Sequence, residues 1–159
     1  MCLLRESMIL AISSMQQTTL WLALAILVVA AIGDLWKRRI PNALPLLLLI
    51  LAVAACALSW HDIGWFSFAI GMILAFVVGL AGFGLGMLGG GDVKLMAALG
   101  AVLGMERLWP VLFWVALAGG VLGVVGRWRK QREIPYAPAI AAGLLLFLLV
   151  GGPLDVLHH

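Results

Sequence analysis

The chain has 159 residues, of which 65% are hydrophobic and 11% are charged, and its mean hydropathy is +1.18. Soluble domains are about 45–50% apolar and about 25% charged, so this composition excludes a water-soluble globular protein and predicts one domain embedded in lipid. The net charge of +3 does not indicate a nucleic-acid partner, because the basic residues lie beside apolar segments, where they report membrane orientation.

Six apolar segments follow one another along the chain. A helix that crosses a bilayer needs about 20 mainly apolar residues. The predicted spans are residues 18–34, 43–60, 65–88, 93–105, 108–126 and 136–154. The predicted fold class is therefore all-α: a polytopic membrane bundle of about six transmembrane helices. We expect residues 1–17 to form an N-terminal tail, 18–154 a single transmembrane domain and 155–159 a C-terminal tail.

The segment 93–105 is short for a span, and the basic residues test whether it crosses. If all six segments cross, eight of the ten Lys and Arg residues lie on one side, which the excess of basic residues in cytoplasmic loops identifies as the cytoplasm. We therefore expect 93–105 to cross, buried among the other helices, with both termini outside. The eight residues are Lys37, Arg38, Arg39, Lys94, Arg127, Arg129, Lys130 and Arg132, whereas Arg5 and Arg107 lie on the other side.

Two of the seven acidic residues stand out by position. Asp34 closes the first span and Asp92 opens the fourth, and the two spans between them return the chain to the same membrane surface. Each aspartate could simply end or cap a helix. Together, two neighbouring carboxylates can supply an acid and a base at once, as in aspartic proteases. We expect a solvated surface role for the remaining acids, which are Glu6, Asp62, Glu106, Glu133 and Asp155.

Three consecutive glycines precede Asp92. Gly89, Gly90 and Gly91 let the backbone take positive φ and approach another chain closely, so we assign them to an active-site loop. Close helix packing, for which membrane helices use small residues, is the better interpretation of four other glycines. These are Gly71, Gly79, Gly82 and Gly86.

Other kinds of site have little support in the sequence. There is no HExxH pair, phosphate loop or dinucleotide fingerprint. The two cysteines, Cys2 and Cys56, are far apart and predict neither a disulfide framework nor a zinc site. The three histidines stand in a loop and at the C-terminus. We therefore expect no metal, no cofactor and no nucleic-acid partner.

Three stretches resemble the motifs of bacterial type IV prepilin peptidases. "GDLWKRRIPNALPLLLLI" resembles the first motif, and "GGGDVKLMAALGAVLG" resembles the second, the GxGD signature followed by VKL. "IPYAPAIAAG" resembles the Ile-Pro-Phe-Gly-Pro segment that opens the last helix, with Tyr136 and Ala137 as departures. The resemblance runs from about residue 20 to about residue 150 and keeps the order of the motifs.

This resemblance implies a GxGD membrane aspartic endopeptidase with Asp34 and Asp92 as catalytic residues. Its substrates would be prepilin or pseudopilin precursors, which lose a short leader at the cytoplasmic face of the inner membrane. The motifs also imply supporting roles for four residues: Ile40, Pro41, Asn42 and Lys94.

The chain looks like the short form found in Flp (Tad) pilus systems. It lacks the segment with two cysteine pairs that accompanies N-methylation in larger members, so we expect cleavage without methylation. The sequence leaves the oligomeric state open. The alternative function is a non-catalytic membrane protein, such as a transporter subunit or an assembly adaptor.

Overall fold

The computed structural model describes residues 2–37, 42–58, 63–128 and 136–151, which are helices and short turns without any strand. The chain is therefore an all-α membrane helix bundle, as its composition predicts. The helices are α1 (Cys2–Lys37), α2 (Ala43–Ala57), α3 (Trp65–Gly84), α4 (Gly90–Trp128) and α5 (Ala137–Leu146), which continues as a π-helix (Phe147–Gly151).

Helix α4 consists of two arms that meet at a sharp reversal. Gly104 stands there with φ 65° and ψ −179°, a backbone conformation that is essentially restricted to glycine. The first N–H after the reversal, that of Met105, donates a hydrogen bond to Ser67 Oγ of α3 at 3.0 Å. Ser67 thus accepts a hydrogen bond from an N–H group at the start of the second arm, which has no acceptor within that arm.

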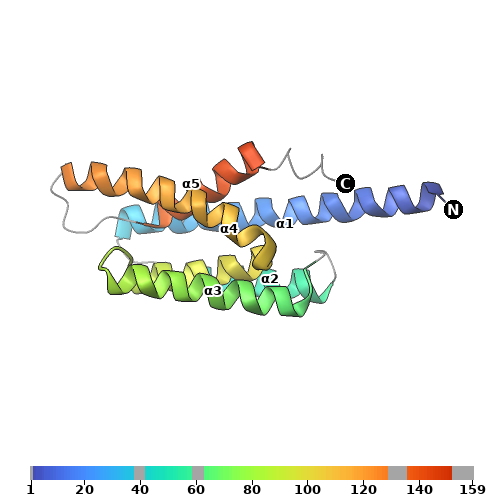
Figure 1. Ribbon diagram of the computed structural model, residues 1–159, viewed down its shortest axis with the longest axis horizontal. Coiled ribbons are helices and arrows are strands. Elements are labelled where there is room, and N and C mark those ends of the chain that lie inside the picture. Colours follow the sequence, from blue (N-terminus) through green and yellow to red (C-terminus); the bar gives the residue numbers. More distant parts are fainter. Residues whose placement is uncertain (1, 38–41, 59–62, 129–135, 152–159) are drawn as a thin grey trace.

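The two arms of α4, residues 90–103 and 105–128, run in opposite directions (Figure 1). With them, the described part of the chain makes six helical passes, in the order and direction that the sequence predicts. The reversal falls at Gly104, slightly before the charged pair at 106–107 that marked the boundary between the predicted fourth and fifth spans.

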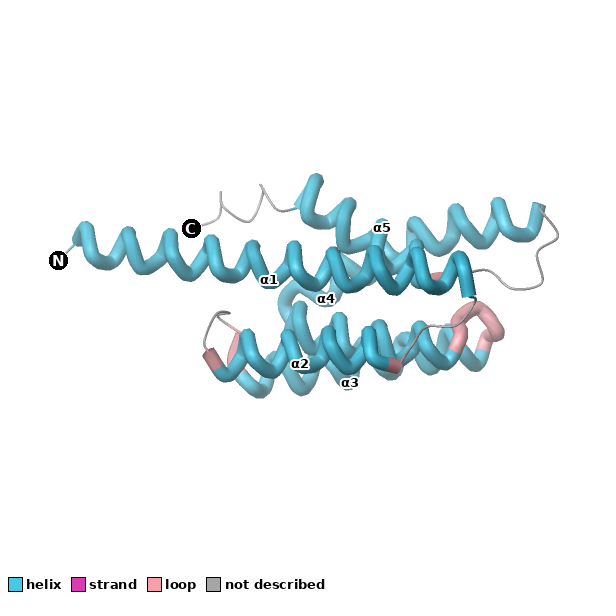
Figure 2. The backbone as a smooth tube through the Cα atoms, turned by 180° about the vertical axis from the view of Figure 1, so that it is seen from behind, coloured by secondary structure: helices cyan, strands magenta, loops and turns pink. Residues whose placement is uncertain are grey.

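The passes form two layers (Figures 1 and 2). One layer holds α2, α3 and the first arm of α4, and the other holds α1, α5 and the second arm of α4. The N-terminal part of α1 extends beyond the other helices. Because α1 begins at Cys2, it takes in nearly all of the stretch assigned to an N-terminal tail.

The first arm of α4 forms much of the core. Leu95, Leu99 and Leu103 are almost completely inaccessible, and most of their neighbours on this arm are buried as well. The prediction that the short fourth segment is buried among the other helices is therefore confirmed. Its backbone also touches that of α3, because a Cβ on Gly71 would overlap the carbonyl oxygen of Gly100. Small residues at such contacts let membrane helices pack closely.

Three helical stretches in the described residues are long and apolar enough to cross a bilayer: Gln17–Asp34, Trp65–Gly84 and Gly90–Val121. The apolar helices Ala43–Ala57 and Ala137–Val150 are shorter. The stretch Gly90–Val121 includes the reversal at Gly104, so it contributes two passes of the bundle.

One end of the bundle brings together helix termini from all parts of the chain. The last turn of α1 and the first turns of α2, α4 and α5 all lie at this end, with the turn between α3 and α4 (Figure 1). Asp34 belongs to the first of these helix ends and Asp92 to the start of α4. We call this the aspartate end, and the opposite end, which contains Gly104, the reversal end.

Candidate active site

Asp34 lies in the last turn of α1 and points into the bundle, with 8% of its surface exposed. Its carboxylate accepts a hydrogen bond from the backbone N–H of Ala137, the first residue of α5. That N–H is free to donate because the first N–H groups of a helix have no partner within the helix. The second carboxylate oxygen, Oδ2, is buried and has no hydrogen-bond partner in the described part of the chain.

Asp92 is the third residue of α4 and is 6% exposed. Its Oδ2 accepts a hydrogen bond from the backbone N–H of Gly89 at 3.0 Å. An acidic side chain in the first turn that reaches back in this way caps the start of the helix. The capping role that the sequence allowed for Asp92 is therefore present, but it uses only one oxygen. Oδ1 is buried and has no partner among the described residues.

The two carboxylates lie close enough for their charges to interact. The parity of the spans predicted that they share one membrane surface, and the structure places both at one end of the bundle. Buried polar atoms in proteins almost always have a hydrogen-bond partner, and leaving a carboxylate oxygen buried without one is costly. Two interacting aspartates, each with such an oxygen, are more than helix capping requires, and functional sites are where such groups gather.

Tyr136 brings a third polar side chain to the pair. It immediately precedes α5, is buried, and lies close enough to Asp92 to interact with its charge. Its ring packs on Gly119 of the second arm of α4, where a Cβ would overlap the phenol. The start of α5 therefore reaches both carboxylates, through Ala137 to Asp34 and through Tyr136 to Asp92. The sequence marked these two residues only as departures from a motif, and their place in the site was missed.

The three glycines before Asp92 do not form the predicted loop. Only Gly89 lies outside a helix, since Gly90 and Gly91 belong to the first turn of α4. Positive φ among the described glycines occurs at Gly86 and Gly104 and not within the triplet. Gly90 and Gly91 are helical because Asp92 caps the start of α4 by accepting a hydrogen bond from the Gly89 N–H.

Gly86 corrects a second expectation. It was assigned to helix packing, but it stands in the turn after α3 with φ 71° and nothing within 4 Å of its Cβ position. The packing interpretation holds for Gly71, which faces backbone, and for Gly79 and Gly82, whose Cβ positions meet Val93 and Leu88.

Two of the four motif-supporting residues contact each other. Lys94 is exposed, and its Nζ donates a hydrogen bond to Oδ1 of Asn42 at 3.3 Å. This bond ties the start of α2 to the start of α4. The other two, Ile40 and Pro41, lie outside the described residues.

No group of three or more His, Cys, Asp or Glu side chains in the described part of the chain is arranged to hold a metal ion. Glu106 is exposed at the reversal end, in agreement with the surface role expected for it. The other surface acids and the histidines fall where the structure describes no side chain: Glu6, Asp62, Glu133, Asp155, His61, His158 and His159.

The fold and the site define a class: an all-α membrane bundle with two interacting, buried aspartates at one end, each in the last or first turn of a helix. The chain belongs to the type IV leader peptidase family, whose family model matches residues 21–124. The matched range includes both Asp34 and Asp92.

Curated relatives extend this match. The prepilin leader peptidase/N-methyltransferase of Bacillus subtilis (strain 168) is 34% identical over 134 residues, which cover 80% of this chain and 54% of that protein. A protein of the same name from Burkholderia pseudomallei (strain 1026b) is 42% identical over 74 residues, or 44% of this chain and 24% of its own. The chain thus spans about half the length of the Bacillus subtilis relative. No solved structure matches.

Proposed function

We propose that this chain is a membrane-embedded aspartic endopeptidase that removes the leader peptide of prepilin-like precursors. The observation that carries the proposal is the pair of buried carboxylates, Asp34 and Asp92, which interact and each keep one oxygen without a partner among the described residues. Family membership and the names of the relatives support prepilin or pseudopilin precursors as the substrates.

The geometry supports the usual chemistry of an aspartic pair. Two nearby carboxylates in an apolar site share one proton, because two negative charges so placed repel each other. The ionised carboxylate takes a proton from an attacking water, and the protonated one donates a hydrogen bond to the scissile carbonyl oxygen. The free oxygens, Asp34 Oδ2 and Asp92 Oδ1, are the atoms for these two tasks, since each aspartate uses its other oxygen to accept a backbone N–H.

The surroundings of Gly90 support access to this pair. Nothing lies within 4 Å of its Cβ position, although Asp92 two residues further on is buried. A peptide bond must leave its helix and lie extended beside the carboxylates to be cut, and backbone without side chains leaves space for it. Gly89, Gly90 and Gly91 therefore form the rim of the site at which we place the extended substrate.

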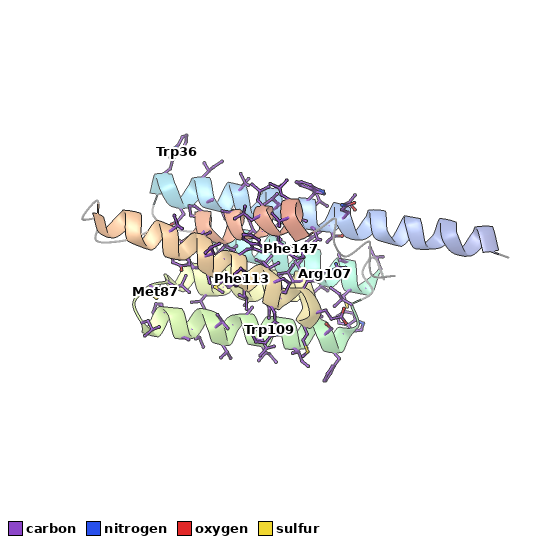
Figure 3. All side chains as sticks on the ribbon, turned by 45° about the horizontal axis from the view of Figure 1, so that its top comes forward. Trp36, Met87, Arg107, Trp109, Phe113 and Phe147 are labelled. Atoms are coloured by element: carbon purple, nitrogen blue, oxygen red, sulfur yellow. The ribbon has the colours of Figure 1, made fainter. Side chains whose placement is uncertain are left out.

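We place the aspartate end at the cytoplasmic face of the inner membrane. This orientation rests on the eight basic residues that the predicted topology assigns to that side. Trp36, 86% exposed beside the site, points away from the bundle (Figure 3). Tryptophan is enriched at the boundary between lipid and water, so its position supports a site at the membrane surface.

The test is prepilin cleavage by Asp34→Asn and Asp92→Asn in membranes. Each change keeps the size and polarity of the side chain and removes its proton exchange, so each should lower cleavage at least about 100-fold. Glu106→Gln is the control, because it removes an exposed carboxylate at the reversal end and should leave cleavage unchanged. Cleavage by either Asn variant at the wild-type rate, with equal amounts of folded protein, would refute the aspartic pair. Absence of cleavage by the wild-type chain itself would favour a non-catalytic transporter subunit or adaptor.

A further inference from the structure

A groove of about 430 Å³ opens between α3 and the second arm of α4. Among the described residues that line it, Tyr136 is the one with a hydroxyl group, and none of them is charged. The lining from α3 and the following turn is Val78, Gly82, Met87 and Leu88. The lining from α4 is Met96, Trp109, Leu112, Phe113, Val115 and Ala116.

The α4 wall of the groove is a straight apolar stripe. Trp109, Leu112, Phe113 and Ala116 are spaced three, four and seven residues apart, so they lie on one helix face and extend over about 10 Å. Trp109 and Phe113 are 56% and 64% exposed, so these two aromatic side chains stand at the open side of the groove. Figure 3 shows them with Met87 along the strip between α3 and the second arm of α4.

At one end the groove is lined by Tyr136, the residue that precedes α5. Tyr136 lines the groove and also interacts with the charge of Asp92. Its ring rests on Gly119, one turn beyond Ala116 in the direction of the aspartate end. A molecule that fills the groove from Trp109 onward therefore follows α4 toward Tyr136 and the aspartate end.

We infer that this groove binds an apolar helical segment of the precursor, adjacent to the bond that is cut. The inference rests on the proposed function and adds the surface that receives the substrate. An apolar lining excludes a charged peptide, because an unpaired charge there would lose its hydration without compensation. The small residues Gly82 and Ala116 on the two walls let a helix backbone come close, as small residues do between membrane helices.

The occupant is a helix because it lies at membrane depth. An extended chain there would leave its N–H and C=O groups without partners, whereas a helix satisfies them internally. The stripe from Trp109 to Ala116 matches about two turns of such a helix. Beyond Tyr136 the chain can unwind at the carboxylates, where the polar groups of the site take over.

Photocrosslinking in membranes tests this placement. The full chain carries a benzoylphenylalanine at position 113, in the groove, or at position 121, which is comparably exposed on the same arm but does not line it. The probe is a precursor with an apolar helix after its leader. We expect capture of the precursor at position 113 and not at 121. Equal capture at both positions, or capture of lipid alone at 113, would overturn the inference.

Filling the groove gives a second measurement. Ala116→Trp should slow precursor cleavage at least about tenfold, because the substrate helix no longer seats beside the site. Val121→Trp, the control, should cleave at the wild-type rate. If the wild type and Ala116→Trp cleave the precursor equally well, the inference is contradicted and the proposed function is not affected.

If the wild-type chain cleaves no precursor, the proposed function is contradicted. Capture at position 113 then still decides whether the groove binds the helix.

Discussion

Both ends of the bundle contain glycines, but the surroundings of these glycines differ. At the reversal end, Gly71 and Gly100 let α3 and α4 touch backbone to backbone, and a Cβ on either would overlap the facing carbonyl group. At the aspartate end, Gly86 and Gly90 have nothing within 4 Å of their Cβ positions. Gly71 and Gly100 therefore allow close helix packing, whereas Gly86 and Gly90 stand beside unoccupied space.

This difference separates stability from activity. The reversal end holds the passes together where no hydrophobic effect favours helix association, because lipid is as apolar as the side chains. The aspartate end buries two carboxylates, each with an oxygen that has no partner among the described residues, and such burial costs stability while it provides reactive groups. Substitutions at the first end should therefore affect folding, and substitutions at the second should affect folding much less.

The largest effect on folding is expected from Gly71→Val. Its Cβ would overlap the Gly100 carbonyl and the backbone of Gly104, and backbone atoms cannot move aside cheaply. Such overpacking costs about 3 kcal/mol. Thermal unfolding in detergent, followed by the loss of monodisperse protein, measures this cost. Gly90→Val is the control at the open end, and its folded fraction should match that of the wild type. A Gly71→Val protein as stable as wild type would show that the two backbones are not in contact.

A smaller effect separates the two glycines with positive φ. Gly86→Ala should cost about 1–2 kcal/mol, the strain of an L-residue with positive φ, because the space around it is open. Gly104→Ala should cost more, since its Cβ would also lie 2.8 Å from Ser67 Oγ and 2.9 Å from Ile63. Ser67 holds the Met105 N–H, so the start of the second arm loses its partner as well. In the same unfolding assay, Gly104→Ala should be less stable than Gly86→Ala. Equal losses of stability would mean that backbone strain alone acts at both sites.

The comparison also shows how far the sequence leads. Hydropathy and the distribution of basic residues predict the six passes and their directions, because both depend on composition along the chain. The even number of spans between Asp34 and Asp92 predicts that both lie at the same membrane surface, without any knowledge of packing. The structure shows six alternating passes and places both aspartates at one end of the bundle, and it confirms that the short fourth segment is buried. The orientation toward the cytoplasm stays a prediction.

What the sequence could not supply depends on contacts between distant segments. Gly86 and Gly71 look alike in the sequence, yet one lies in an open turn and the other against a backbone. The approach of Ala137 and Tyr136 to the two carboxylates arises when α5 packs beside α1 and the second arm of α4. The hydrogen bond from Lys94 to Asn42 joins residues 52 positions apart, and no local pattern predicts such a pair.

That hydrogen bond gives the smallest expected effect and the finest test of the division between the two ends. It is exposed, so Asn42→Ala should lower the free energy of unfolding by less than about 1 kcal/mol. Asn42→Asp keeps an acceptor oxygen and adds a charge opposite to that of Lys94, so it should retain the stability, with an advantage that shrinks as salt is added. Unfolding at low and high salt measures the stability of both variants.

If the bond only ties the start of α2 to that of α4, the cleavage rate of Asn42→Ala should fall only as far as the amount of folded protein falls. Loss of cleavage by Asn42→Ala at unchanged stability, restored by Asn42→Asp, would show instead that this exposed pair positions the first turn of α4 and with it the Asp92 carboxylate.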